Sequence, residues 1–269
     1  MTAPSHSASS LTNRPIRTGL LIFFSSVFVW WSFGLPKPLF EYPKSVLIED
    51  HTGALLGARI ASDGQWRFPA GDSIPERFQI CLVQFEDRRF FQHWGVDWRA
   101  LVRAVRQNIK AGRTVSGGST ISMQVIRMAR GNRARTVWQK LLETLLAFRL
   151  EAAYSKAEIL GLWVANAPFG GNVVGLEAAS WRYYQKAPHL LSWSEAATLA
   201  VLPNSPALIH PGRNRNALQA KRNRLLVRLQ QQKIIDQTSY ELAIAEPLPE
   251  RPLPLPSFAP RLLDRVAQE

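Results

Sequence analysis

The chain has 269 residues and a mass of 30.3 kDa; 46% of its residues are hydrophobic and 20% are charged, a composition that supports a sizeable core and excludes wholesale disorder. The balance of 33 Lys and Arg against 20 Asp and Glu gives a net charge of +13, which favours an anionic partner such as nucleic acid, a membrane surface or a phosphorylated substrate. The single cysteine, Cys81, excludes an intrachain disulfide and a cysteine-based zinc cluster.

The N-terminus predicts a membrane anchor. Residues 1–18 are polar and include Arg14 and Arg17, whereas residues 19–35 carry no charge. Seventeen helical residues span about 26 Å, close to the roughly 30 Å of a hydrocarbon core. We therefore expect a cytoplasmic segment at 1–18, a transmembrane helix at 19–36, and the rest of the chain outside the cytoplasm. A cleaved signal peptide is the alternative, but no A-x-A site follows the apolar run.

A short β segment is predicted next. Residues 44–70 contain β-branched runs that are interrupted by the turn segments HTG (51–53) and SDG (62–64). This pattern is typical of a small hairpin, so residues 37–72 are expected to form a juxtamembrane and hairpin segment.

Helical patterns dominate from about residue 75, and we expect one domain over residues 73–245. Asp97 is placed to cap a helix with an apolar stripe, and residues 136–153 predict a longer helix. Ser155 and Ser192 each begin a capping-box pattern ahead of an apolar run.

Three segments between and after these helices lack a helical pattern. Residues 112–120 and 167–175 are rich in glycine and predict loops. Residues 246–269 are rich in proline and predict a linker-like tail.

Basic side chains are concentrated in two stretches. Residues 98–142 hold ten Lys and Arg and no Asp or Glu, and they surround the loop at 112–120. The backbone N–H groups and hydroxyls of that loop suit phosphate oxygens, although a solvated basic face is the alternative. The second stretch, 213–233, predicts a solvated helix or one that lies against anionic lipid headgroups.

Five segments, in order, resemble the signatures of the peptidoglycan glycosyltransferases, the family of the glycan-polymerising domain in class A penicillin-binding proteins. These segments are EDRRFFQHWGVD (86–97), GGSTISMQ (117–124), RTVWQKLLE (135–143), KAEILGLWVANAPFGGNVVGLEAAS (156–180) and SEAATLAVLPNSP (194–206). Three positions depart from the family pattern: Gln139 stands in place of the usual Arg, Trp163 in place of the usual Tyr and Ala165 in place of the usual Leu. The chain has no S-x-x-K or KTG motif, so we expect no transpeptidase domain and leave open whether it is a stand-alone enzyme or part of a longer one.

The resemblance implies a mainly α fold, with a lysozyme-like head and a small membrane-proximal jaw beside the transmembrane helix and the hairpin. It implies an inverting enzyme that polymerises lipid II into β-1,4-linked glycan strands and releases undecaprenyl diphosphate. Such an enzyme would be a single-pass protein of the bacterial cytoplasmic membrane, with its catalytic domain on the outer face.

The expected partners are lipid II, the growing glycan strand, membrane lipid and other cell-wall synthesis proteins, including a separate transpeptidase, and no nucleic acid. No cofactor is expected to be required, and a divalent cation near the diphosphate is left open.

The resemblance also assigns site residues. Glu86 would accept the proton of the attacking hydroxyl, and Glu143 is the second catalytic carboxylate. Positive charge stabilises a departing diphosphate, and this task falls to Arg127, Arg135 and Lys140. The remaining substrate-binding residues are Asp87, Ser119, Thr120, Gln124 and Asn166. His93 is expected to position its loop, Ser119 also fits ordinary loop and cap chemistry, and no metal site is predicted.

The sequence leaves three other functions as alternatives. A catalytically inactive membrane-bound scaffold is the main alternative, because Gln139 replaces a cation and no transpeptidase motif is present. A nucleic-acid-binding protein has only the net charge in its favour. A lysozyme-type hydrolase also uses a Glu in an α-rich cleft, but hydrolysis releases no diphosphate for the basic stretch to hold.

Overall fold

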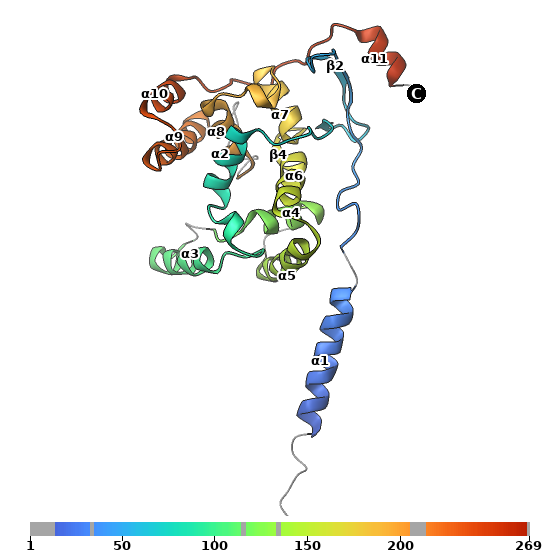
Figure 1. Cartoon of the computed structure of the whole chain (residues 1–269), viewed down its shortest axis with the longest axis vertical. Coiled ribbons are helices and arrows are strands. Elements are labelled where there is room, and N and C mark those ends of the chain that lie inside the picture. Colours follow the sequence, from blue (N-terminus) through green and yellow to red (C-terminus); the bar gives the residue numbers. More distant parts are fainter. Residues whose placement is uncertain (1–13, 33–34, 114–116, 133–135, 205–213, 268–269) are drawn as a thin grey trace, which may run out of the picture. The chain divides into compact units, whose positions relative to one another are not determined.

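The part of the chain that the structure describes is mostly helical (Figure 1). The computed structural model describes residues 14–32, 35–113, 117–132, 136–204 and 214–267. The chain divides into two units, residues 1–39 and 40–269.

The smaller unit contains helix α1, Arg14–Ser32. This helix begins five residues before the predicted span at 19–36 and ends four residues before its end. The apolar side chains from Leu20 to Phe24, and that of Phe28, are exposed. Within the described residues, no helix combines the length and the apolar character that a membrane crossing requires.

The larger unit holds the remaining helices and all the strands of the described residues. Its helices are α2 (Glu76–Glu86), η1 (Phe90–Gln92), α3 (Trp98–Ala111), α4 (Ile121–Ala129), α5 (Val137–Ala153), α6 (Lys156–Asn166), α7 (Leu176–Tyr184), η2 (Pro188–Leu190), α8 (Trp193–Val201), η3 (Leu202–Asn204), α9 (Arg215–Gln231), α10 (Gln237–Ala245) and α11 (Pro260–Val266). Its strands are β1 (Val46–Glu49), β2 (Leu55–Arg59), β3 (Trp66–Arg67), β4 (Pro168–Gly170) and β5 (Val173–Val174).

Local capping signals place several helices where the sequence predicts them. The Asp97 side chain accepts a hydrogen bond from the backbone N–H of Ala100 at 2.8 Å and begins α3. Both predicted capping boxes are present, Ser155 with Glu158 and Ser192 with Glu195, and they begin α6 and α8. These predictions are confirmed because a cap depends only on residues within one turn of each other.

The β structure differs from the prediction of one hairpin over 44–70. Strands β1 and β2 form an antiparallel hairpin, but β3 pairs in parallel with β5 in a second sheet of order β3-β5-β4. Strands β4 and β5 come from residues 167–175, which were predicted to be a loop. The backbone N–H of Trp66 donates to the carbonyl of Asn172 at 2.7 Å, a long-range pairing that local turn signals do not encode.

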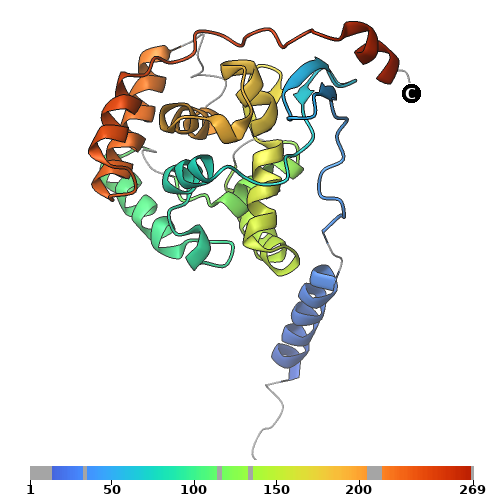
Figure 2. The same ribbon diagram turned by 45° about the horizontal axis from the view of Figure 1, so that its top comes forward.

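Helix α2 lies within the helical unit and packs against α8 and α9, while α4 packs against α5 and α6 (Figures 1 and 2). Three buried rings join α2 to the α6 region: Phe78 lies 6.4 Å from Trp163 and 6.4 Å from Phe169, measured between ring centroids. This packing joins the first turn of α2 to α6 and to β4.

Helix α9 is partly buried, and the prediction of a solvated basic helix is wrong for this element. The Arg222 side chain has no exposed surface and donates hydrogen bonds to Ser194 Oγ at 3.0 Å and to the Glu246 carbonyl at 2.6 Å. Arg228 donates to the carbonyl of Gln84 at 2.8 Å. Basic side chains on this helix therefore hold α8, α10 and α2 together, because buried polar atoms need partners.

The Pro-rich tail, predicted to be a linker, packs against other parts of the larger unit. The side chain of Arg182 in α7 donates to the Leu253 carbonyl, and the backbone N–H of Phe258 donates to the Leu56 carbonyl at 2.8 Å. Asp264 in α11 forms an ion pair with Arg59 in β2. Prolines favour an extended backbone, and here that backbone lies along α7 and the hairpin.

Candidate active site

Glu86 is the last residue of α2, and its carboxylate lies against α4. Gln124 Nε2 donates a hydrogen bond to Glu86 Oε2 at 2.6 Å. The two residues are 38 positions apart and were both predicted to belong to the site. The structure therefore brings the proposed base and one substrate-binding residue into direct contact.

The surroundings of Glu86 favour its neutral form. Burial raises the pKa of the Glu86 carboxyl above its ordinary value, and the charge of Asp87 acts in the same direction. The hydrogen bond from Gln124 and the charges of Lys221 and Arg127 oppose this rise in the pKa. A carboxylate with a raised pKa is a better proton acceptor than an ordinary solvated Glu, as general base catalysis requires.

Arg127 connects this carboxyl with the second predicted one. Its Nε atom donates to Glu143 Oε1 at 3.2 Å, and the side chains of the two residues are only 15% and 10% exposed. Since Arg127 also acts electrostatically on Glu86, α2, α4 and α5 each contribute one charged group to the same region. Lys140 is exposed on α5, one helical turn before Glu143, while Arg135 lies outside the described residues.

Asp87 and Thr120 fasten the loop after α2 to the start of α4. Both Asp87 carboxylate oxygens lie 3.0 Å from His93 Nε2, and Asp87 Oδ2 accepts the backbone N–H of Ile121 at 3.1 Å. The Thr120 hydroxyl donates to the Gly95 carbonyl at 2.5 Å. These groups use their polar atoms within the protein, and the contact of His93 agrees with the positioning role expected for it.

The last two predicted residues lie on the flanks of these elements. Ser119 is half-buried and directly precedes Thr120, the N-cap of α4. Asn166 ends α6, and its side-chain amide donates to the Leu162 carbonyl at 2.9 Å. The contact seen for Asn166 is thus within its own helix.

Lys221 is a charged neighbour of Glu86 that the sequence did not indicate. It belongs to α9, and its ammonium donates to Asn204 Oδ1 at 2.8 Å. Burial lowers the pKa of Lys221 and the charge of Glu86 raises it, so the two groups interact electrostatically. No spacing signal points to this pair, because 135 positions separate the two residues in the chain.

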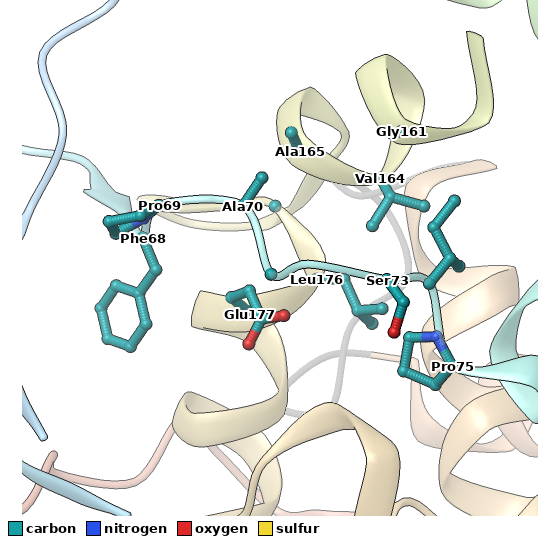
Figure 3. A pocket seen from close by; sticks show the side chains of 13 residues that line it. Phe68, Pro69, Ala70, Ser73, Pro75, Gly161, Val164, Ala165, Leu176 and Glu177 are labelled. Atoms are coloured by element: carbon teal, nitrogen blue, oxygen red, sulfur yellow. The ribbon is translucent and has the colours of Figure 1, made fainter. Parts of the chain in front are cut away.

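A separate small cavity of about 40 Å³ lies between the segment 68–75, α6 and α7 (Figure 3). It contains none of the predicted site residues. Burial raises the pKa of Glu177, which lines it, to about 7, with a further contribution from the charge of Glu49. Over the described residues, no group of three or more His, Cys, Asp or Glu side chains is arranged to hold a metal ion.

Comparison with known proteins gives one family. The family profile described as Transglycosylase matches residues 55–230. Penicillin-binding protein 1C of Escherichia coli is 37% identical over 226 residues, which cover 84% of this chain and 29% of that protein. The chain thus spans less than a third of the length of that relative. In the sequence, the segments DGQWRFP (63–69) and SMQ (122–124) predict a likeness to penicillin-binding protein 1C within this family. The comparison confirms that likeness.

One further relative and one solved structure also match the chain. The biosynthetic peptidoglycan transglycosylase of Pasteurella multocida is 34% identical over 186 residues, which cover 69% of this chain and 73% of that protein. The crystal structure of penicillin-binding protein 1A from Haemophilus influenzae aligns with 85% of this chain and 24% of that chain, at a TM-score of 0.44 and 20% identity.

Proposed function

This chain belongs to the transglycosylase family, and from that premise we propose that it joins sugars carried on a lipid diphosphate into the glycan strands of peptidoglycan. The observation that carries the proposal is the arrangement of Glu86, Gln124, Arg127 and Glu143 on three adjacent helices. It supplies a proton acceptor and a cationic group, Arg127, in one region, and both are needed when an alcohol displaces a diphosphate.

In the proposed reaction, the free 4-hydroxyl of the acceptor sugar gives its proton to Glu86. The hydroxyl oxygen forms a bond to the anomeric carbon of the donor, and the bond from that carbon to the diphosphate oxygen breaks. The electron pair of the broken bond leaves with the diphosphate. Because the hydroxyl attacks the face opposite the leaving diphosphate, the configuration of the anomeric carbon is inverted. A general base of this kind contributes about 10²–10⁴-fold.

The cations are proposed to act on the leaving group. Lys140 and Arg127, with Arg135, would hold the diphosphate as its charge develops, and Glu143 would orient Arg127 through their hydrogen bond. We assign Ser119, Thr120, Gln124, Asp87 and Asn166 to the walls of the sugar and phosphate sites. No cofactor is proposed as a requirement, and the site would admit a divalent cation bound by the diphosphate itself.

A membrane location is proposed from the exposed apolar surface of the larger unit. Helices α3 and α5 meet where Phe148 contacts Trp94 and Trp98, at centroid distances of 5.9 and 6.4 Å. The exposed apolar side chains on these two helices and on the segment before α3 are Phe91, Trp94, Trp98, Val102, Val105, Ile109, Val137, Trp138, Leu141 and Leu145. Exposed Arg99, Arg103 and Arg106 accompany them on α3, a combination that suits the interface of an anionic bilayer.

We propose that this surface is the jaw of the family fold and that it lies in the outer face of the bacterial cytoplasmic membrane, where the lipid-linked donor is confined. In this proposal α1 is the single anchor, with the N-terminus in the cytoplasm. The growing glycan strand, membrane lipid and other cell-wall synthesis proteins, including a separate transpeptidase, are the proposed partners.

The test is polymerisation of labelled lipid II by the full chain in detergent micelles. We expect wild-type protein to form glycan strands and Glu86→Gln to lose about 10²–10⁴-fold in rate. Glu241→Gln, which changes an exposed carboxylate on α10, is the matched control and should retain the wild-type rate. Equal, near-background rates for folded wild type and Glu86→Gln would favour the scaffold and reject the proposed enzyme.

A further inference from the structure

Glu86, Gln124 and Trp163 form a chain of hydrogen bonds that crosses three helices. The Trp163 indole Nε1 of α6 donates to Gln124 Oε1 of α4 at 3.0 Å, and Gln124 Nε2 donates to Glu86 Oε2 of α2 at 2.6 Å. Trp163 has 1% of its surface exposed, and the assignments above give it no part in the reaction.

The indole determines which way the Gln124 amide faces. An indole N–H is a donor only, so it requires the amide oxygen as its partner. The amide nitrogen of Gln124 must then point to the opposite side, where Glu86 lies. If the amide were turned by 180°, two donors would meet at Trp163 and two acceptors would meet at Glu86.

The position of the indole is itself fixed by its aromatic neighbours. Its centroid lies 6.4 Å from that of Phe78 and 6.5 Å from that of Phe169, and both of these rings are fully buried. Phe78 belongs to α2, the helix that ends at Glu86. The donor that orients Gln124 is therefore packed against the same helix that carries the Glu86 carboxylate.

We infer that Trp163 is a positioning residue, which holds the Gln124 amide so that it donates to Glu86 and keeps Glu86 available as a proton acceptor. This inference rests on the proposed function, because it assigns Glu86 as the base. It also gives a task to the Trp that replaces the usual Tyr of the family at this position.

The expected effect has a definite sign. A hydrogen bond to the ionised carboxylate favours ionisation, whereas an acceptor turned towards it favours the protonated form. The other charged groups that act on the Glu86 carboxyl are Lys221 from α9, Arg127 from α4 and the adjacent Asp87. Glu195 of α8 is bound to Lys186 instead. Removal of the indole N–H changes none of these charges. A change in the pKa of Glu86 in such a variant therefore reports a change in the orientation of the Gln124 amide.

The first experiment compares the pH dependence of lipid II polymerisation for wild type and Trp163→Phe, each as the full chain in detergent micelles. We expect the acidic midpoint of the kcat/KM profile to be about one pH unit higher in Trp163→Phe than in wild type. At a pH below the midpoints of both proteins this shift is about a tenfold loss of kcat/KM, and the loss is smaller at alkaline pH. Trp181→Phe removes another largely buried indole, from α7, and is the matched control. A profile of Trp163→Phe that superimposes on that of Trp181→Phe would overturn the inference.

A coupled variant separates positioning from a general packing defect. In a Gln124→Leu background no amide remains to be oriented, so adding Trp163→Phe should leave the midpoint of the acidic limb unchanged. An equal upward shift in both backgrounds would show that Trp163 acts by another route.

A second measurement needs no change at Trp163. In protein labelled with ¹⁵N-tryptophan, one of the nine indole N–H signals should titrate with the midpoint of the acidic limb, and its titration should be lost in Glu86→Gln. The absence of any such signal would also overturn the inference. Failure of wild-type protein to polymerise lipid II at every pH would instead refute the proposed function, so the two failures are distinguishable.

Discussion

The ion pair between Arg127 and Glu143 should contribute little to the free energy of unfolding. Removal of only one of the two charges should nevertheless destabilise the folded protein strongly. The Arg127 Nε to Glu143 Oε1 distance is 3.2 Å, and the side chains are 15% and 10% exposed. Removal of one member leaves the other charge nearly buried without its partner, which costs about 3–5 kcal/mol in such sites. Because some water still reaches both side chains, we take about 3 kcal/mol for Arg127→Met and for Glu143→Met.

The double variant should behave differently. Replacement of both charges by methionine leaves no unpaired charge, and a well-packed apolar pair is often as stable as a buried ion pair. We therefore expect Arg127→Met/Glu143→Met to lie within about 1 kcal/mol of wild type, and to be folded but inactive in lipid II polymerisation. That outcome would show that the pair is retained for chemistry and not for stability.

Thermal unfolding of the full chain, followed by circular dichroism, measures this difference. A loss of about 3 kcal/mol lowers Tm by roughly 6–12 °C for a domain of this size, at about 2–4 °C per kcal/mol. Arg261→Met, which changes an exposed side chain on α11, controls for a general effect of the substitution. Single variants that each cost under about 1 kcal/mol, or a double variant whose cost is the sum of both, would refute the reasoning.

Three further outcomes follow from the buried charged groups. The acidic midpoint of the kcat/KM profile should lie above the ordinary pKa of a glutamic acid, because burial raises the pKa of Glu86 and a general base must be ionised to act. An acidic midpoint at or below that ordinary pKa would contradict this prediction. Unfolding free energy should fall by roughly 2–3 kcal/mol as pH rises from 4.5 to about 7, since folded protein holds the Glu177 proton longer than unfolded protein does, and urea titrations of Glu177→Gln should lack this fall. Arg222→Met should lower Tm by roughly 10 °C because it leaves buried carbonyls unpaired, whereas Arg224→Met, an exposed change on the same helix, should leave Tm nearly unchanged, and equal shifts would argue against this burial.

Local signals account for the parts of the fold that the sequence predicted. Asp97, Ser155 and Ser192 begin helices because each cap needs only a side-chain oxygen and a backbone N–H two or three residues later. The family signatures likewise indicated Glu86 and Gln124 as site residues, since both belong to motifs that can be recognised without coordinates.

The sequence pattern did not predict which charged side chains are buried. The basic residues of 213–233 have the composition of a solvated helix, yet Arg222 is fully buried and Lys221 interacts electrostatically with Glu86. The pairing of β3 with β5 was missed in the same way, because it joins residues more than 100 positions apart. Periodicity indicates that a helix has faces, but it does not indicate which other element covers each face.

Composition, caps and motif order were enough to indicate a mainly helical chain of the transglycosylase family and to name its proposed base. The contact of that base with Gln124, the orientation of Gln124 by Trp163 and the sharing of Arg127 between two carboxylates depended on how α2, α4, α5 and α6 pack. Hydrogen bonds and pKa values vary over a few ångströms, and only the folded chain brings residues tens of positions apart to such distances.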